Sequence, residues 1–132
     1  PSEILYPYDE EADHVVVCEG PLDAKSLQLQ GINATATMKN YISPRQAEIL
    51  STFDGRVIIG FDNDEAGLRG CQRFDQLRRE RLMDDFWVCC PPKRYKDWNE
   101  AHTKGEDLPA WIARESLLYN FEYKMLNEIS SL

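Results

Sequence analysis

The sequence predicts an α/β fold in which helices flank both faces of a mostly parallel, four-stranded sheet. Short runs rich in β-branched residues alternate along the chain with segments of helical periodicity, which is typical of βαβ units with right-handed crossovers. The run at 56–61 is apolar after its first residue, as in strands that are buried on both faces. The 132 residues are 42% hydrophobic and 29% charged, which suits one globular domain with a substantial core.

The first half of the chain predicts two strands and two helices after an irregular, acidic lead-in. Gly31 is a helix stop signal, and Ser43 followed by Pro44 is a specific helix start signal. In order, the elements are the lead-in at 1–13, a strand at 14–19, a helix at 22–31, a strand at 32–37 and a helix at 43–53.

The second half adds two strands and three helices. In order, these are a strand at 56–61, a helix at 65–82, a strand at 86–91, a short helix at 97–102 and a long amphipathic helix at 107–129. The spacing of three in the helix at 65–82 predicts a buried face made of Leu68, Cys71, Phe74 and Leu77. We therefore divide the chain into the lead-in at 1–13, an α/β domain at 14–104, and a C-terminal helix at 105–132 that packs on this domain or leads to a further one.

Cysteine usage and charge narrow the possible functions. None of the four cysteines (18, 71, 89 and 90) forms a CxxC pair and only two histidines are present, so a structural zinc site is not expected. We interpret the cysteines as reduced packing residues of a cytoplasmic protein. No apolar run is long enough to cross a membrane. The net charge of −8 argues against direct contacts to phosphates, although cations bound by carboxylates can make an acidic site attract phosphate.

Acidic side chains follow three of the predicted strands. Glu19 ends the first strand, Asp62 and Asp64 follow the third, and Asp97 follows the fourth and its loop. Ligands of open α/β sheets bind beyond the carboxyl ends of the strands, so we expect these four carboxylates to meet at one edge. Asp23 lies in the first turn of the following helix, where an acid also fits the helix dipole.

Clustered carboxylates with no histidine or cysteine favour a hard divalent cation, Mg²⁺ before Ca²⁺ or Mn²⁺. Asp62 and Asp64 are two residues apart, so in an extended segment both side chains point the same way. Each acid taken alone also fits a helix cap or a solvated turn, and Asn63 suits a turn. The coincidence of acids at three strand ends favours the metal site.

Basic side chains are expected at the same edge of the sheet. Lys93, Arg94 and Lys96 flank Asp97, and Lys39 lies in the loop after the second strand, where all four could contact phosphate. The arginines of the helix at 65–82 are expected to form a solvated face. Two aromatic residues, Tyr95 and Trp98, could stack on a base or lie in the core, and we favour the core for Trp98.

Two motifs resemble the signatures of the TOPRIM domain, which topoisomerases and primases share. "VVVCEGPLDA" is a strand that ends in Glu-Gly-x-x-Asp, and "VIIGFDNDEAG" is a strand that ends in Asp-x-Asp. The forms "FDNDEAG" and "KDWNEA" are more similar to bacterial primases and phage primase-helicases than to topoisomerases. The resemblance covers roughly residues 14–104.

The resemblance implies a compact, Rossmann-like catalytic domain that uses Mg²⁺ or Mn²⁺ to synthesise RNA primers. Glu19 would match the catalytic glutamate and Asp62 and Asp64 the metal-binding pair, while Asp97 and Asp23 would match further acids. The resemblance implies a single-stranded DNA template and nucleoside triphosphates as partners, with a helicase domain or subunit as a further partner. Primases of this family usually carry Gly-Thr after the second strand, where this chain has Lys39 and Asn40.

Three alternatives remain open. Stand-alone TOPRIM proteins resemble nucleases, and the same acids could hydrolyse RNA or DNA. A phosphoacceptor receiver domain also uses a doubly wound sheet and Mg²⁺, with Asp62 as acceptor, but receivers carry a Lys after a fifth strand that this sequence does not predict. A degenerate, binding-only domain is disfavoured by the intact set of acids.

Overall fold

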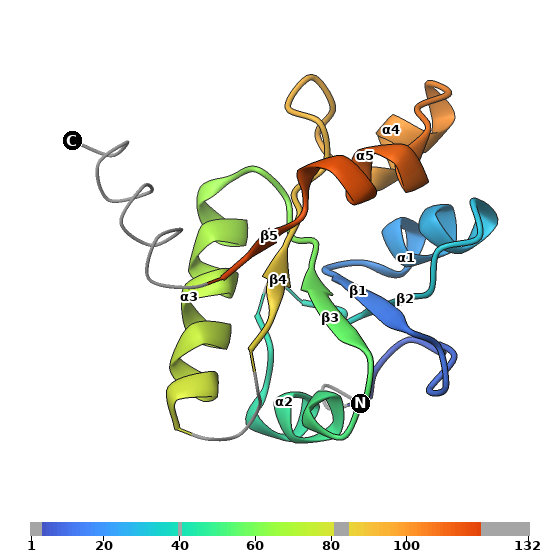
Figure 1. The fold of residues 1–132 in the computed structure, drawn as a ribbon. Coiled ribbons are helices and arrows are strands. Elements are labelled where there is room, and N and C mark those ends of the chain that lie inside the picture. Colours follow the sequence, from blue (N-terminus) through green and yellow to red (C-terminus); the bar gives the residue numbers. More distant parts are fainter. Residues whose placement is uncertain (1–3, 40, 81–84, 120–132) are drawn as a thin grey trace.

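A computed structural model describes residues 4–39, 41–80 and 85–119 of the chain. Figure 1 shows a sheet with helices on both faces. The elements are β1 (His14–Cys18), α1 (Pro21–Leu29), β2 (Ala34–Ala36), α2 (Pro44–Ser51), β3 (Arg56–Ile59), α3 (Glu65–Arg79), β4 (Trp87–Val88), α4 (Trp98–Thr103), α5 (Leu108–Glu115) and β5 (Leu117–Leu118). The predicted alternation of strands and helices is confirmed.

The described part of the sheet has five strands, one more than predicted, in the order β2-β1-β3-β4-β5. The first four are parallel, and β5 runs antiparallel to β4. The prediction of one continuous helix over 107–129 was wrong, because α5 ends at Glu115 and β5 follows after Ser116. Pairing with β5 satisfies backbone groups that β4 would otherwise expose at the sheet edge. Residues 120–132 of the predicted helix lie outside the described residues.

Two apolar layers hold the sheet between the helices. Val15 and Val17 of β1 face the layer that includes α2 and α3, whereas Val16 and Cys18 face the layer that includes α1, α4 and α5. This alternation is the period of two expected of a strand buried on both faces. All four cysteines are free, and Cys90 is the only one that is not fully buried.

Cap signals begin the helices where the sequence predicts. Ser43 and Gln46 form a capping box at α2, with Pro44 in its first turn. In α3, Cys71, Phe74 and Leu77 are buried as predicted, but Leu68 is 52% exposed. The prediction for Leu68 was wrong because the buried residues in the first turns of α3 are the glycines Gly67 and Gly70.

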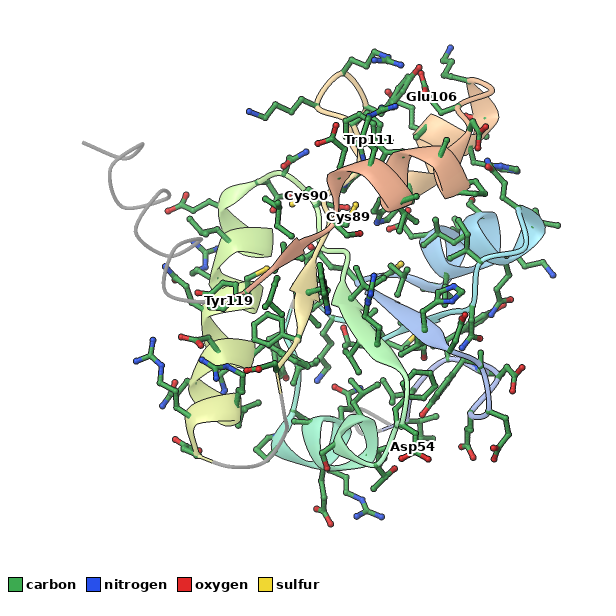
Figure 2. The ribbon with its side chains drawn as sticks, viewed as in Figure 1. Asp54, Cys89, Cys90, Glu106, Trp111 and Tyr119 are labelled. Atoms are coloured by element: carbon green, nitrogen blue, oxygen red, sulfur yellow. The ribbon has the colours of Figure 1, made fainter. Side chains whose placement is uncertain are left out.

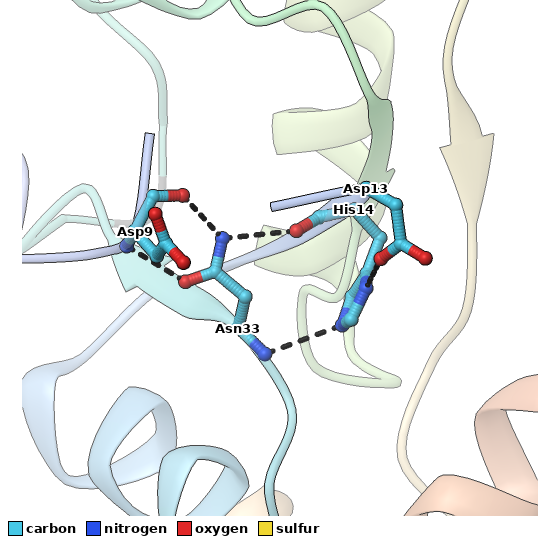
Figure 3. Close-up of polar contacts among 4 residues, drawn as sticks. All are labelled: Asp9, Asp13, His14 and Asn33. Carbon is cyan, nitrogen blue, oxygen red and sulfur yellow. Dashed lines mark hydrogen bonds and ion pairs between the residues drawn. The ribbon is translucent and has the colours of Figure 1, made fainter. Parts of the chain in front are cut away.

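The lead-in lies along the edge strand β2. The side chain of Asn33 donates to the backbone oxygens of Asp9 and His14 at 2.8 and 2.9 Å, and accepts from the Asp9 amide at 2.9 Å (Figure 3). His14 pairs with Asp13 through Nδ1 at 2.6 Å and accepts from the Asn33 amide through Nε2 at 3.2 Å. These bonds join the lead-in to the starts of β1 and β2. No helix among the described residues is long and apolar enough to cross a membrane.

Candidate active site

Glu19 and Asp62 are joined at the carboxyl ends of β1 and β3. These strands are parallel neighbours with Val17 opposite Ile59, so the residues that follow them leave the sheet side by side. The backbone amide of Asp62 donates a hydrogen bond to Glu19 Oε1 at 3.1 Å. Burial raises the pKa of Glu19, whereas this hydrogen bond opposes the rise.

Asp62 carries the most perturbed carboxyl group of the site. Its Oδ1 atom is buried and has no hydrogen-bond partner among the described residues. Burial, followed by the charges of Glu19, Asp23, Asp64 and Asp97, raises the pKa of Asp62 to about 7. An ionised Asp62 therefore needs a cation, because a buried charge without a partner is costly.

Asp64 caps α3 and also adds to the negative potential. Its Oδ1 accepts from the Gly67 amide at 2.7 Å, so the helix-cap interpretation is confirmed for this residue. Gly67 is required here, because a Cβ atom on it would lie 1.9 Å from the backbone oxygen of Asp62. This close approach holds the start of α3 against the segment that carries Asp62.

Asp97 and Asp23 both bind the first turn of α4. Asp97 caps the helix by accepting from the Glu100 amide at 2.8 Å, and buried Asp23 accepts from the Asn99 amide at 3.0 Å. Burial, with a further contribution from Asp97, raises the pKa of Asp23. These bonds attach α4 to α1 beside the other acids.

The donor set fits a hard divalent cation. It offers carboxylate oxygens, one of them buried and without a partner among the described residues, and the acids raise one another's pKa. No three acid, histidine or cysteine side chains form a complete metal cage in the part of the chain that the structure describes. Mg²⁺ commonly binds to one or two carboxylates and keeps waters or substrate phosphates as its other ligands, so an incomplete cage is compatible with it.

The predicted basic residues divide into two groups. Lys93, Arg94 and Lys96 are exposed on the loop between β4 and α4, and Lys96 is near enough to Asp23 to lower its pKa. Arg94 forms an ion pair with Glu106. Lys39 lies apart in the loop after β2, where its Nζ donates to the hydroxyl of Tyr41 at 3.0 Å and contacts no acid among the described residues.

The aromatic residues of this loop serve the scaffold. Trp98 is fully buried, as predicted, and its Nε1 donates to the backbone oxygen of Gly60 at 2.7 Å. The hydroxyl of Tyr95 donates to Glu106 at 2.9 Å. Glu106 lies at the same end of the molecule as Trp111 (Figure 2). Through its contacts with both side chains, Glu106 holds Arg94 and Tyr95 in place, a role that the sequence does not predict.

Asn63 is a second residue of the site whose role the sequence does not predict. Its side-chain amide donates to the backbone oxygen of Pro91 at 2.6 Å. This bond connects the loop after β3, which carries Asp62 and Asp64, to the loop that leads to Asp97. The position of Asn63 between two acids indicates that it lies near the site. Its hydrogen-bond partner, Pro91, is 28 residues away and is not evident from the sequence.

Comparison with known proteins agrees with this architecture. The Toprim-like family model matches residues 16–102, more than half of the chain. The DNA primase of Campylobacter jejuni is 37% identical over 90 residues, and that of Clostridium acetobutylicum is 32% identical over 73 residues. These alignments cover 63% and 54% of this chain but only 15% and 12% of the two relatives.

Solved structures give the same result for the fold. A DNA primase domain from Pseudomonas aeruginosa superposes with a TM-score of 0.73 at 26% identity, over 90% of this chain and 39% of that one. β5 runs antiparallel to β4, unlike the strands of a doubly wound parallel sheet, which argues against a receiver domain. The chain therefore belongs to the Toprim-like family and is a TOPRIM domain of the primase type.

Proposed function

We propose that this chain is the Mg²⁺-dependent catalytic domain that synthesises RNA primers in a DNA primase or primase-helicase. The observation that carries the proposal is the buried Oδ1 of Asp62, which has no hydrogen-bond partner among the described residues and lies beside Glu19 in a domain of this family. The chain spans 15% or less of its DNA primase relatives, so the reaction of the whole protein is part of the proposal. Tight binding of the template would require residues outside this chain.

Asp62 and Asp64 would hold the metal, with Asp23 and Asp97 adding negative potential around it. When bound, Mg²⁺ supplies positive charge that neutralises the phosphates of an incoming nucleoside triphosphate. Lys93 and Lys96 would bind phosphate oxygens from the adjoining loop. Lys39, in the loop after β2, would contact the nucleic acid backbone.

Glu19 is suited to hold or accept a proton at the reacting hydroxyl. Its Oε1 is held by the Asp62 amide at 3.1 Å, and burial raises its pKa towards the range where a carboxylate becomes a better base. The same carboxylate could instead complete the metal coordination. Both roles require the position that the hydrogen bond maintains.

The template and helicase partners are inferred from membership of the Toprim-like family. A primase catalytic domain solved with single-stranded DNA has a TM-score of 0.66 to this chain, and the primase fragment of the bacteriophage T7 primase-helicase has a TM-score of 0.57. At 20% and 22% identity these neighbours support only the fold. Single-stranded DNA and a helicase domain are therefore proposed as partners on the basis of family membership.

The test compares primer synthesis with strand cleavage in the full-length protein. One reaction contains single-stranded template, ribonucleotides and Mg²⁺, and the other contains a labelled RNA or DNA strand with Mg²⁺ alone. We expect synthesis that falls about 100-fold or more in Glu19→Gln, the typical cost of losing a general acid or base. Glu11→Gln in the exposed lead-in is the matched control and should retain activity. Cleavage without synthesis would contradict the primase proposal and support a nuclease function instead.

A further inference from the structure

A recess lies next to the candidate active site, between the loop that follows β4 and the elements α5 and β5. It has a volume of about 500 Å³, which is within the range of small-molecule pockets. Its apolar walls are formed by Pro91, Pro92, Trp111 and Leu117. None of the acids of the proposed metal site lines this recess.

Asn63 is shared by the recess and the active site. It lines the recess, and it stands in the chain between the two acids Asp62 and Asp64. Its hydrogen bond to Pro91 at 2.6 Å fixes one wall of the recess relative to those acids. A molecule in the recess would therefore lie beside whatever the acids and their metal bind.

The walls of the recess are held in place before any ligand arrives. Trp111 is half-buried, and its Nε1 donates to the backbone oxygen of Cys90 at 2.9 Å (Figure 2). Pro91 and Pro92 are both buried and have restricted backbones. Rigid apolar and aromatic walls suit a flat ring, because stacking gains contact area at little entropic cost.

The charges around the recess favour a ring that carries phosphate. Lys93 and Arg94 line it, and Lys93 forms no ion pair with any described residue. Glu115 is the carboxylate that also lines it, and Arg114 pairs with Glu115 at 3.1 Å. The whole chain has a net charge of −8, but this recess combines exposed cations with apolar walls. Such a combination suits a ligand that has both a ring and a phosphate.

We propose that this recess binds the nucleobase of a nucleotide whose phosphate is bound by Lys93. The proposal rests on the primase function proposed above and specifies where a nucleotide lies relative to the acids. Two sources supply the same chemistry: an incoming ribonucleoside triphosphate and a nucleotide of a single-stranded template. The experiment is designed to separate them.

Cys90 provides a direct readout, because it lines the recess while the other three cysteines are buried. The rate of Cys90 modification by methyl methanethiosulfonate is measured by mass spectrometry with Mg²⁺ alone, and then with ATP, tripolyphosphate or a dT8 oligonucleotide added. We expect ATP or dT8 to slow modification at least fivefold, and the more protective of the two identifies the source. Tripolyphosphate has no base and should protect little. Equal protection by tripolyphosphate and ATP, or no protection by ATP or dT8, would overturn the proposal.

Leu117→Glu tests the recess by a second route, with Leu29→Glu as the matched control. Both leucines are exposed, at 55% and 63%, but only Leu117 lines the recess. We expect Leu117→Glu to weaken the protecting ligand at least tenfold and Leu29→Glu to leave its affinity unchanged. Equal effects of the two variants would contradict the proposal.

Asp62→Asn distinguishes failure of the recess from failure of the primase function. It alters an acid of the proposed metal site and no residue that lines the recess, so the ligand at a saturating concentration should still protect Cys90 while synthesis is lost. Primer synthesis by the wild-type protein without protection of Cys90 would overturn the recess alone. Protection of Cys90 in a wild-type protein that makes no primers would overturn the primase function alone.

Discussion

The backbone amide of Asp62 donates a hydrogen bond to Glu19 Oε1 at 3.1 Å and joins two residues that are 43 positions apart. The bond holds the Glu19 carboxylate next to a second acid whose own Oδ1 is buried and lacks a partner among the described residues. The two carboxyl groups are thus positioned by the backbone although their charges repel.

The metal-free protein should lose stability as the pH rises from 5 to 8. Asp62 has a pKa of about 7 in the folded protein and an ordinary value of 3.8, so the folded state holds a proton that the unfolded state has released. Stability therefore falls with rising pH through this window, and the raised pKa values of Glu19 and Asp23 act with the same sign. Because Asp62 is only half-buried, we expect its share to be about 1–2 kcal/mol after screening. Urea unfolding in EDTA at pH 5 and pH 8 measures this loss.

Asp62→Asn should remove most of that pH dependence. At pH 8 the variant should be more stable than the metal-free wild type by about 1–2 kcal/mol, because an amide relieves the repulsion. The same variant should lose primer synthesis. Unfolding of the variant at pH 8 would show instead that Asp62 is structural.

Millimolar Mg²⁺ should raise the melting temperature of the wild-type protein at pH 8, since a ligand that binds the folded state stabilises it. Asp62→Asn should show a much smaller rise. Asp54→Asn, which changes an exposed acid between α2 and β3, should respond as the wild type does. Equal rises in all three proteins would indicate non-specific cation binding, and no rise in the wild type would argue against a preformed site.

Gly67→Ala should destabilise the domain strongly, whereas Gly20→Ala should not. The new Cβ at position 67 would lie 1.9 Å from the Asp62 backbone oxygen, and relief of this clash must displace α3 at a cost of about 3 kcal/mol. At position 20 nothing lies within 4 Å, and the extended backbone with φ −115° accommodates alanine. Chemical denaturation of both variants tests the pair. A stable Gly67→Ala would mean that α3 does not approach Asp62 so closely.

Asn63→Ala should loosen the loop between β4 and α4. Loss of the 2.6 Å bond to Pro91 is expected to cost about 1 kcal/mol and to leave the loop less well positioned relative to Asp62. Hydrogen exchange should become faster at residues 93–97, and KM for nucleotide should rise. Gln76→Ala, an exposed amide of α3, is the control and should change neither. Unchanged exchange in Asn63→Ala would mean that other contacts hold the loop.

Met38→Gly should stabilise the domain slightly, while Met38→Ala should not. Met38 has φ +69° in the loop after β2, a left-handed conformation that costs an L-residue about 1–2 kcal/mol. Glycine removes this cost but loses more chain entropy on folding, so the net gain should be about 0.5 kcal/mol. Alanine keeps the strain and therefore serves as the control. Urea unfolding of both variants gives the comparison, and a gain in the alanine variant would point to a cause other than backbone strain.

The sequence by itself determined the alternation of strands and helices and the position of acids at the strand ends. These features are local: β-branched runs, the Ser43–Pro44 start signal and the acids after each strand need no knowledge of distant residues. Burial of Trp98 also agreed with prediction. The exposure of Leu68 did not, since periodicity alone does not reveal that glycines make the contact at the start of α3.

Only the tertiary structure decided which acids cap helices and which one is left unpaired. Asp64 and Asp97 accept hydrogen bonds from backbone amides of the helices that begin beside them, whereas Asp62 Oδ1 has no such donor in the part of the chain that the structure describes. The pairing of β5 with β4 and the bond from Asn63 to Pro91 likewise join residues far apart in the chain. Local patterns specify which groups reach the edge of the sheet, but burial and pairing depend on contacts that form only when the chain has folded.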